Sequence, residues 1–200
     1  MKKIRKRIIL CVCLVMCLSL LYGCGGSWEL ELSSIDTDTI YVSNDGSIEL
    51  ANVEKFDKDY YSKSQLEDFI KETIDTYKES EDSGEVTMED FSVKDEVAKV
   101  LLKFDSAQTY ADFQGIDFQV VHTEDIQGNL VLPESFVSAD ESSNVSKDTV
   151  IKEKGLKLLI VNEPLHVQLD GKIKYYSEAS ITGDNVAETT GEKTAIIVYE

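Results

Sequence analysis

The placement of the cysteines most constrains what this chain can fold into. The sequence has four, Cys11, Cys13, Cys17 and Cys24, and residues 25–200 contain none. Everything after residue 24 therefore folds without an internal disulfide or a cysteine zinc site. A domain without such cross-links depends on its hydrophobic core, and a chain of about 150 residues or more buries enough surface to form one.

The start of the chain has the pattern of a secretory signal peptide. The first seven residues carry five positive charges, and fifteen uncharged residues follow, from Ile8 to Tyr22. A basic region, an apolar run of this length and a small residue before the cleavage site define such a signal. A membrane-spanning helix would need about 20 mainly apolar residues, and glycines interrupt this run too early. The sequence therefore predicts a signal peptide over residues 1–23.

The residues around Cys24 resemble a bacterial lipobox. Leu21, Gly23 and Cys24 match its pattern, whereas Tyr22 stands where a small or aliphatic residue is usual. The resemblance implies cleavage between Gly23 and Cys24 and a diacylglyceryl group on the Cys24 thiol. Two acyl chains on one residue satisfy the two-chain requirement for stable membrane anchoring. The alternative is an ordinary secreted protein in which Cys24 is a free thiol.

Beyond the signal peptide we expect one acidic domain. Residues 24–39 are predicted to form the lipidated N-terminus and a flexible tether, and residues 40–200 a single domain. The mature chain keeps all 38 acidic residues and 15 of the 20 basic ones, so its net charge is −23. Such a charge repels nucleic-acid phosphates and anionic lipid headgroups, which makes nucleic acid an unexpected partner.

The pattern along residues 40–115 predicts a mixture of strands and helices. Two β-rich runs flank Asn44-Asp45-Gly46, a strong hairpin signal. The clearest helix lies within residues 60–80, where Ser64 and Glu67 match a capping box. Two further strands are expected on either side of residues 94–96, and a short helix from Ser106 to a left-handed cap at Gly115. Five apolar residues of the long helix share one face at helical spacing: Leu66, Phe69, Ile70, Ile74 and Tyr77.

The remainder of the chain reads mainly as strands. A strand is expected over residues 117–123, a solvated loop over residues 139–148, and a second hairpin turn at Asp170-Gly171. The last residues, 194–200, are expected to form an inner strand. Together these elements predict an α+β fold, in which a mainly antiparallel sheet carries one long amphipathic helix on one face.

The candidate catalytic and metal-binding residues are few. His122 and His166 each stand alone among apolar neighbours, which is more typical of a tolerated residue than of a catalyst. No nucleophile-elbow, zinc-protease or phosphate-loop motif occurs in the sequence. A glycosidase carboxylate pair is disfavoured because the only tryptophan lies in the predicted tether. We therefore predict a protein that is not an enzyme and needs no cofactor.

Two local features suggest binding instead of catalysis. Acidic pairs that could hold calcium weakly occur at Asp36 and Asp38 and at Asp57 and Asp59, although no EF-hand loop is present and a solvated acidic surface is the simpler interpretation. The segment Phe56 to Ser62 alternates acids with aromatics, and a second tyrosine pair follows at 175–176. Tyrosine is favoured in binding surfaces, but a half-buried sheet explains both pairs as well.

The lipobox, the segment IYVSNDGSIELANVEKFDKDYYS and the acidic helix after it are similar to uncharacterised surface lipoproteins of low-GC Gram-positive, clostridia-like bacteria. The likeness covers residues 1–105. It implies a lipoprotein on the outer, extracytoplasmic face of the cell membrane, and only Cys24 carries over as a functional residue. We expect a non-enzymatic cell-envelope module that binds a protein or polymer. The alternative is a small solute- or cation-binding lipoprotein associated with a transporter.

Overall fold

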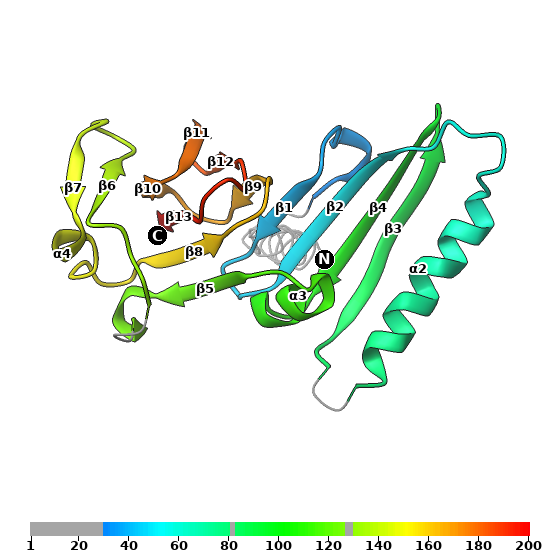
Figure 1. The fold of residues 1–200 in the computed structure, drawn as a ribbon, viewed down its shortest axis with the longest axis horizontal. Helices are drawn as coiled ribbons and strands as arrows, with labels where there is room; N and C mark the ends of the chain where they lie inside the picture. The colour runs from blue at the N-terminus through cyan, green and yellow to red at the C-terminus, as the bar shows by residue number, and fades with distance from the viewer. Residues whose placement is uncertain (1–29, 81–82, 127–129) are drawn as a thin grey trace, which may run out of the picture.

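The computed structural model describes residues 30–80, 83–126 and 130–200. The predicted signal peptide, the cleavage site at Gly23 and the lipidation site at Cys24 lie outside these residues. Within them the chain is an α+β protein made mostly of two antiparallel-rich sheets, with a long helix on one side (Figure 1). The predicted fold class is confirmed.

The larger sheet, sheet A, has seven strands. Its neighbouring strands are antiparallel except β1 and β9, which run parallel. The predicted hairpin at Asn44-Asp45-Gly46 is confirmed, since it joins β1 to β2 and Gly46 has a φ of 93°. The predicted strands around residues 94–96 are also confirmed. In spatial order the strands are β11 (Ala179–Gly183), β12 (Val186–Thr189), β9 (His166–Leu169), β1 (Thr39–Val42), β2 (Ile48–Lys55), β4 (Val97–Phe104) and β3 (Val86–Lys94).

The smaller sheet, sheet B, has six strands, all antiparallel to their neighbours. The predicted inner strand at the end of the chain is confirmed, because β13 lies between β8 and β10. The predicted strand over residues 117–123 is confirmed as the edge strand β5. In spatial order the strands are β5 (Phe118–His122), β8 (Lys157–Val161), β13 (Ala195–Tyr199), β10 (Ile173–Ser177), β6 (Ser135–Ser138) and β7 (Asn144–Ser146).

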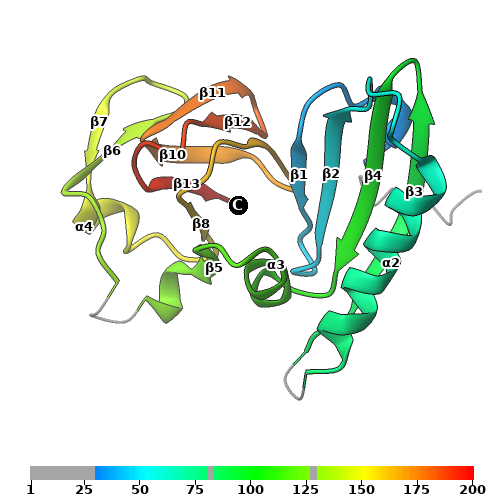
Figure 2. The same ribbon diagram turned by 45° about the vertical axis from the view of Figure 1, so that its right-hand side comes forward.

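One hydrophobic core connects the two sheets. Alternate residues of each strand point to the same face, and the inward set from both sheets meets in this core, for example Ile40 and Leu50 of sheet A with Leu159 and Ile197 of sheet B. A second core lies on the other face of sheet B, where Phe136 packs with residues of α4 (Lys147–Val150). The strands β11, β12 and β9 lie next to sheet B, while β1, β2, β4 and β3 extend away from it (Figure 2).

The helices fill the open side of that extension. The long helix α2 (Lys63–Lys78) connects β2 to β3 and lies along β3 (Figures 1 and 2). Its predicted capping box is wrong: the N-cap is Ser62, whose side chain accepts a hydrogen bond from the Gln65 N–H, and Ser64 lies inside the helix. Ser62 and Gln65 show the same S-x-x-[EQ] spacing two residues earlier. The short helix α3 (Ala107–Gln114) is confirmed, with Ser106 as N-cap and Gly115 left-handed at φ 67°.

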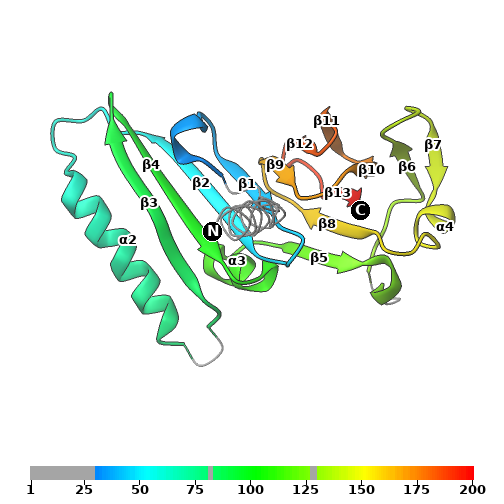
Figure 3. The same cartoon turned by 180° about the vertical axis from the view of Figure 1, so that it is seen from behind.

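The predicted flexible tether is wrong over the part that the structure describes. Leu30 and Leu32 are buried on the outer face of sheet A, against Tyr41, Ala51 and Leu101. The segment includes the short 3-10 helix η1 (Leu32–Ser34), which contacts β4, and it leads into β1 (Figure 3). Polar residues dominate its composition, but the alternation of Leu30 and Leu32 with acids gives it one apolar side, which the sheet covers.

Two further predictions need correction. The expected loop at 139–148 contains strand β7 and the start of α4; β7 is polar because it lies at the sheet edge, where its side chains remain exposed or half-buried. The expected hairpin at Asp170-Gly171 does not pair its flanking strands, since β9 belongs to sheet A and β10 to sheet B. The turn signal was correct, but the chain uses it to change sheets. A second short 3-10 helix, η2 (Thr123–Asp125), follows β5.

Candidate functional site

The two ends of helix α2 differ in what their apolar residues contact. Of its predicted apolar face, Ile74 is buried, and Ile70 and Tyr77 pack against the main core. Leu66 is half-buried, whereas Phe69 is 65% exposed. The apolar stripe predicted from the sequence is therefore only partly covered, because α3 packs against the C-terminal half of α2 through the Tyr77–Phe113 ring contact, 5.3 Å between centroids.

An aromatic cluster lies in the loop that leads into α2. Tyr60 is 77% exposed and Tyr61 42% exposed. The Tyr61 ring contacts Phe56 at 4.9 Å and Tyr60 at 5.0 Å between centroids. The backbone holds this cluster in place: the Phe56 N–H donates to the Glu96 carbonyl in the β3–β4 turn at 2.7 Å. This hydrogen bond ties the start of the loop to the β3–β4 turn.

The exposed aromatics border two neighbouring hollows beside α2. One hollow, about 460 Å³, lies between the loop, the start of α2 and the ends of β2 and β4. A second, about 450 Å³, lies between α2 and α3, and Phe69 borders both. We call the two hollows together the α2 groove. Its lining is largely apolar and includes Phe56, Tyr60, Tyr61, Leu66, Phe69, Tyr77 and Phe113.

Few charged residues line the α2 groove. Glu54 and Lys55 lie at its loop end, and Glu72 lies at its α3 end. An open apolar surface bordered by isolated charges is suited to burying an apolar partner surface while a charged rim sets its orientation. It is not the arrangement of a nucleophile with an adjacent base.

The second tyrosine pair does not contribute to this surface. Tyr175 and Tyr176 lie on β10 in sheet B, and both are half-buried. The Tyr175 hydroxyl donates to the Glu153 carboxylate, and this hydrogen bond, with burial second, raises the pKa of Tyr175 to about 12. The half-buried sheet interpretation therefore applies to this pair, and binding potential remains with Tyr60 and Tyr61.

The two histidines are not brought together. His122 is exposed on β5 in sheet B, while His166 is on β9 in sheet A, with its Nδ1 3.7 Å from Glu188 Oε1. Neither touches the α2 groove.

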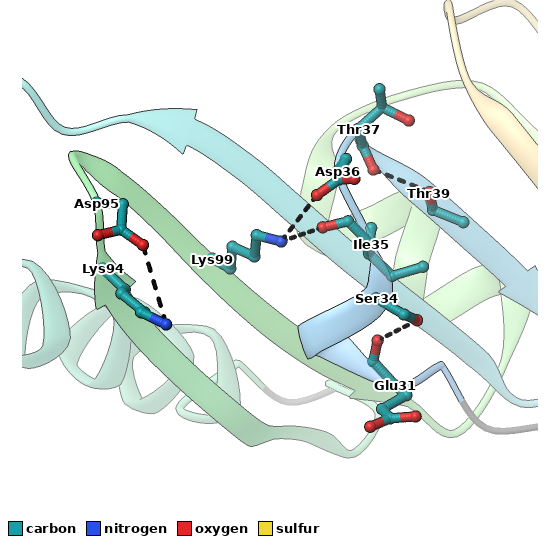
Figure 4. A network of polar contacts seen from close by, with 9 residues as sticks. All are labelled: Glu31, Ser34, Ile35, Asp36, Thr37, Thr39, Lys94, Asp95 and Lys99. Atoms are coloured by element: carbon teal, nitrogen blue, oxygen red, sulfur yellow. Dashed lines mark hydrogen bonds and ion pairs between the residues drawn. The ribbon is translucent and has the colours of Figure 1, made fainter.

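Three of the four acidic residues considered for calcium have structural contacts. The Asp38 carboxylate accepts the Val53 N–H at 2.7 Å, and Asp36 lies 3.3 Å from the Lys99 ammonium on the outer face of sheet A (Figure 4). Lys99 also donates to the Ile35 carbonyl. Asp57 pairs with Lys58 at 2.9 Å. Among the residues whose positions the structure describes, no group of three or more histidines, cysteines or acids is arranged to hold a metal ion.

Comparison with known proteins adds no relative. No family model, no curated protein and no solved structure matches this chain. Over residues 30–80, 83–126 and 130–200, no helix is long and apolar enough to span a membrane.

Proposed function

We propose that this chain is a bacterial lipoprotein, held on the extracytoplasmic face of the cell membrane by a diacylglyceryl group on Cys24. We further propose that it is a non-enzymatic envelope module that binds another envelope protein through the α2 groove. The observation that carries the binding proposal is the exposure of Tyr60, Tyr61 and Phe69 around one apolar groove. Soluble proteins rarely leave contiguous apolar surface exposed unless a partner covers it.

The choice of a protein partner over a small molecule follows from the form of the groove. Small-molecule sites enclose most of their ligand's surface, whereas both hollows of the α2 groove are open to solvent. Tyrosine and phenylalanine supply large contact areas at low conformational-entropy cost, and such residues are enriched at protein interfaces. A partner with an apolar ridge would bury Phe69 and Tyr60 together.

The ordered start of the chain sets how far the domain stands from the lipid. The Leu30 N–H donates to the buried Glu49 carboxylate at 2.7 Å, which fixes residue 30 to the outer face of sheet A. Only residues 25–29 lie between this point and the lipidated cysteine, and the six Cα–Cα steps from residue 24 to residue 30 span at most about 20 Å. A partner in this proposal is therefore another protein at the membrane surface.

The anchoring proposal has a direct test. The wild-type protein should incorporate labelled palmitate and fractionate with membranes, and Cys24→Ser should lose both properties. The variant Cys17→Ser is the matched control, because it changes a cysteine inside the predicted signal peptide and should leave labelling intact. Labelling of Cys24→Ser at the wild-type level would refute the lipid site.

The binding proposal is tested by removing the exposed rings. The double variant Tyr60→Ser with Phe69→Ser should keep its stability within about 0.5 kcal/mol, since surface substitutions rarely change it more. When proteins are cross-linked in intact cells, the anchored wild-type protein should form a discrete adduct with its partner, and the double variant should not. Val131→Ser removes another apolar side chain, 89% exposed, outside the groove, and should retain the adduct. An adduct unchanged by the double variant would refute the groove as the interface.

The solute- or cation-binding alternative makes a different prediction. A pocket binder is stabilised by its ligand by about 2.7 kcal/mol at a hundred times the dissociation constant. Thermal unfolding of the mature chain with EDTA, with millimolar Ca²⁺ and with a panel of sugars, amino acids and peptides would reveal such a shift. A reproducible rise for a sugar, an amino acid or Ca²⁺ would favour this alternative over the protein-binding module.

A further inference from the structure

The two sheets end in four edge strands, and three of them carry features that prevent pairing with another chain. In sheet A, β3 has a bulge between Met88 and Asp90, and β11 has one between Ile181 and Gly183. In sheet B, β7 has only three residues. Bulges and short edges are the usual protection against strand addition. By contrast, β5 pairs with β8 through five consecutive residues in an unbroken register.

The register shows which backbone groups of β5 face outward. Beyond the end of the strand, the Thr123 N–H donates to the Leu156 carbonyl at 2.9 Å. Bonded and non-bonded positions alternate in an antiparallel pair, so the backbone groups of residues 119 and 121 point to β8. Those of Phe118, Val120 and His122 point to the free edge. Within the described parts of the chain no strand pairs with that edge.

A groove runs along this edge, beside α3. It is lined by residues 118–121 of β5 and by Ala107, Gln108, Ala111 and Asp112 of α3, with a volume of about 390 Å³. The ring contact between Tyr110 and Phe118, 4.7 Å between centroids, fixes the helix against the strand. Both ribbon views show α3 next to β5 (Figures 1 and 2). The small side chains of the two alanines leave room for the side chains of an added strand.

The charge around the groove selects the kind of segment that can enter it. Residues 105–126 contain five acids and no lysine or arginine. Two of those acids, Asp112 and Asp117, line the groove itself. A basic segment gains attraction along this edge, whereas a second copy of the chain, with a mature net charge of −23, brings the same acids to the contact.

We propose that the free edge of β5, together with the groove between β5 and α3, binds an extended basic segment of another protein as an additional strand of sheet B. Main-chain hydrogen bonds to Phe118, Val120 and His122 give the affinity, and alternate side chains of the segment enter the groove. The proposal concerns a different surface from the α2 groove and does not depend on it or on the lipid anchor.

Three peptides test the proposal on the isotope-labelled mature chain carrying Cys24→Ser. The first is a nine-residue peptide alternating lysine with valine, the second is the same peptide methylated on every backbone nitrogen, and the third replaces its lysines with glutamate. We expect only the first to shift the amide signals of Phe118, Val120 and His122 and to slow their hydrogen exchange. Methylation keeps the charge and removes the backbone donors, so equal binding by the second peptide would overturn strand addition.

Charge-matched variants separate a specific edge from general attraction. Asp112→Asn with Asp117→Asn should weaken binding of the lysine–valine peptide about 2- to 30-fold, the range expected for two exposed ion pairs. Asp148→Asn with Glu192→Gln changes the net charge equally at distant exposed positions and should leave the affinity unchanged. An equal loss in both variants, no response at the β5 amides, or a dimer of the free chain that protects them would each overturn the proposal.

Discussion

Replacing Leu32 with alanine tests whether the chain before β1 belongs to the folded domain. Leu32 is 3% exposed and packs with Leu30, Tyr41, Ala51 and Leu101 on the outer face of sheet A. The substitution removes three carbon atoms from this cluster, which at about 0.8 kcal/mol for each buried methylene costs about 2–2.5 kcal/mol. Leucine-to-alanine changes in cores span about 2–5 kcal/mol, so a site at the surface of a sheet should fall near the lower limit.

The assay is thermal unfolding of residues 24–200, monitored by circular dichroism. For a domain of this size, about 2–2.5 kcal/mol lowers Tm by about 4–10 °C. Ser33→Ala is the matched control, because Ser33 is exposed in the same segment and should change stability by less than about 0.5 kcal/mol. If Leu32→Ala lowers Tm no more than Ser33→Ala, the segment is not packed. The longer tether predicted from the sequence would then be correct.

Two further predictions concern the turn between the sheets and the start of α3. Gly171→Ala should lower stability by about 1–3 kcal/mol, because its Cβ would lie 1.9 Å from the Glu200 backbone oxygen. Gly183→Ala is the control: its Cβ would make an ordinary contact with the Val186 side chain at 3.4 Å, so this variant should unfold near the wild-type temperature. Hydrogen bonds from the Thr109 hydroxyl, and then from the Glu85 N–H, lower the pKa of Asp105. A lowered pKa stabilises the folded state at neutral pH, and this contribution is lost as pH falls below about 4. Urea midpoints of wild type and Asp105→Asn should therefore differ at pH 7 and approach each other as pH falls below about 4, and a gap of constant size would contradict this role.

Local patterns in the sequence determined the elements whose ends are set by one or two residues. The Asp45-Gly46 turn, the Ser106 cap and the left-handed Gly115 each depend on backbone preferences within a few positions. The leader and the position of Cys24 are likewise local, and their prediction needs no knowledge of the fold. Turn chemistry shows that the chain turns, but not where it goes next: Asp170-Gly171 carries the same signal as Asp45-Gly46 and leads to a different sheet.

The tertiary structure decided which apolar residues find a partner. The periodicity of α2 placed Phe69 and Ile74 on one face, but α3 covers only the C-terminal part of that helix, so Ile74 is buried and Phe69 is exposed. Leu32 shows the reverse, since its polar neighbours suggested a tether and sheet A buries it. The free edge of β5 exists only once the strand order is known. Periodicity fixes the direction of a side chain relative to its own element, whereas burial depends on distant segments that no local pattern records.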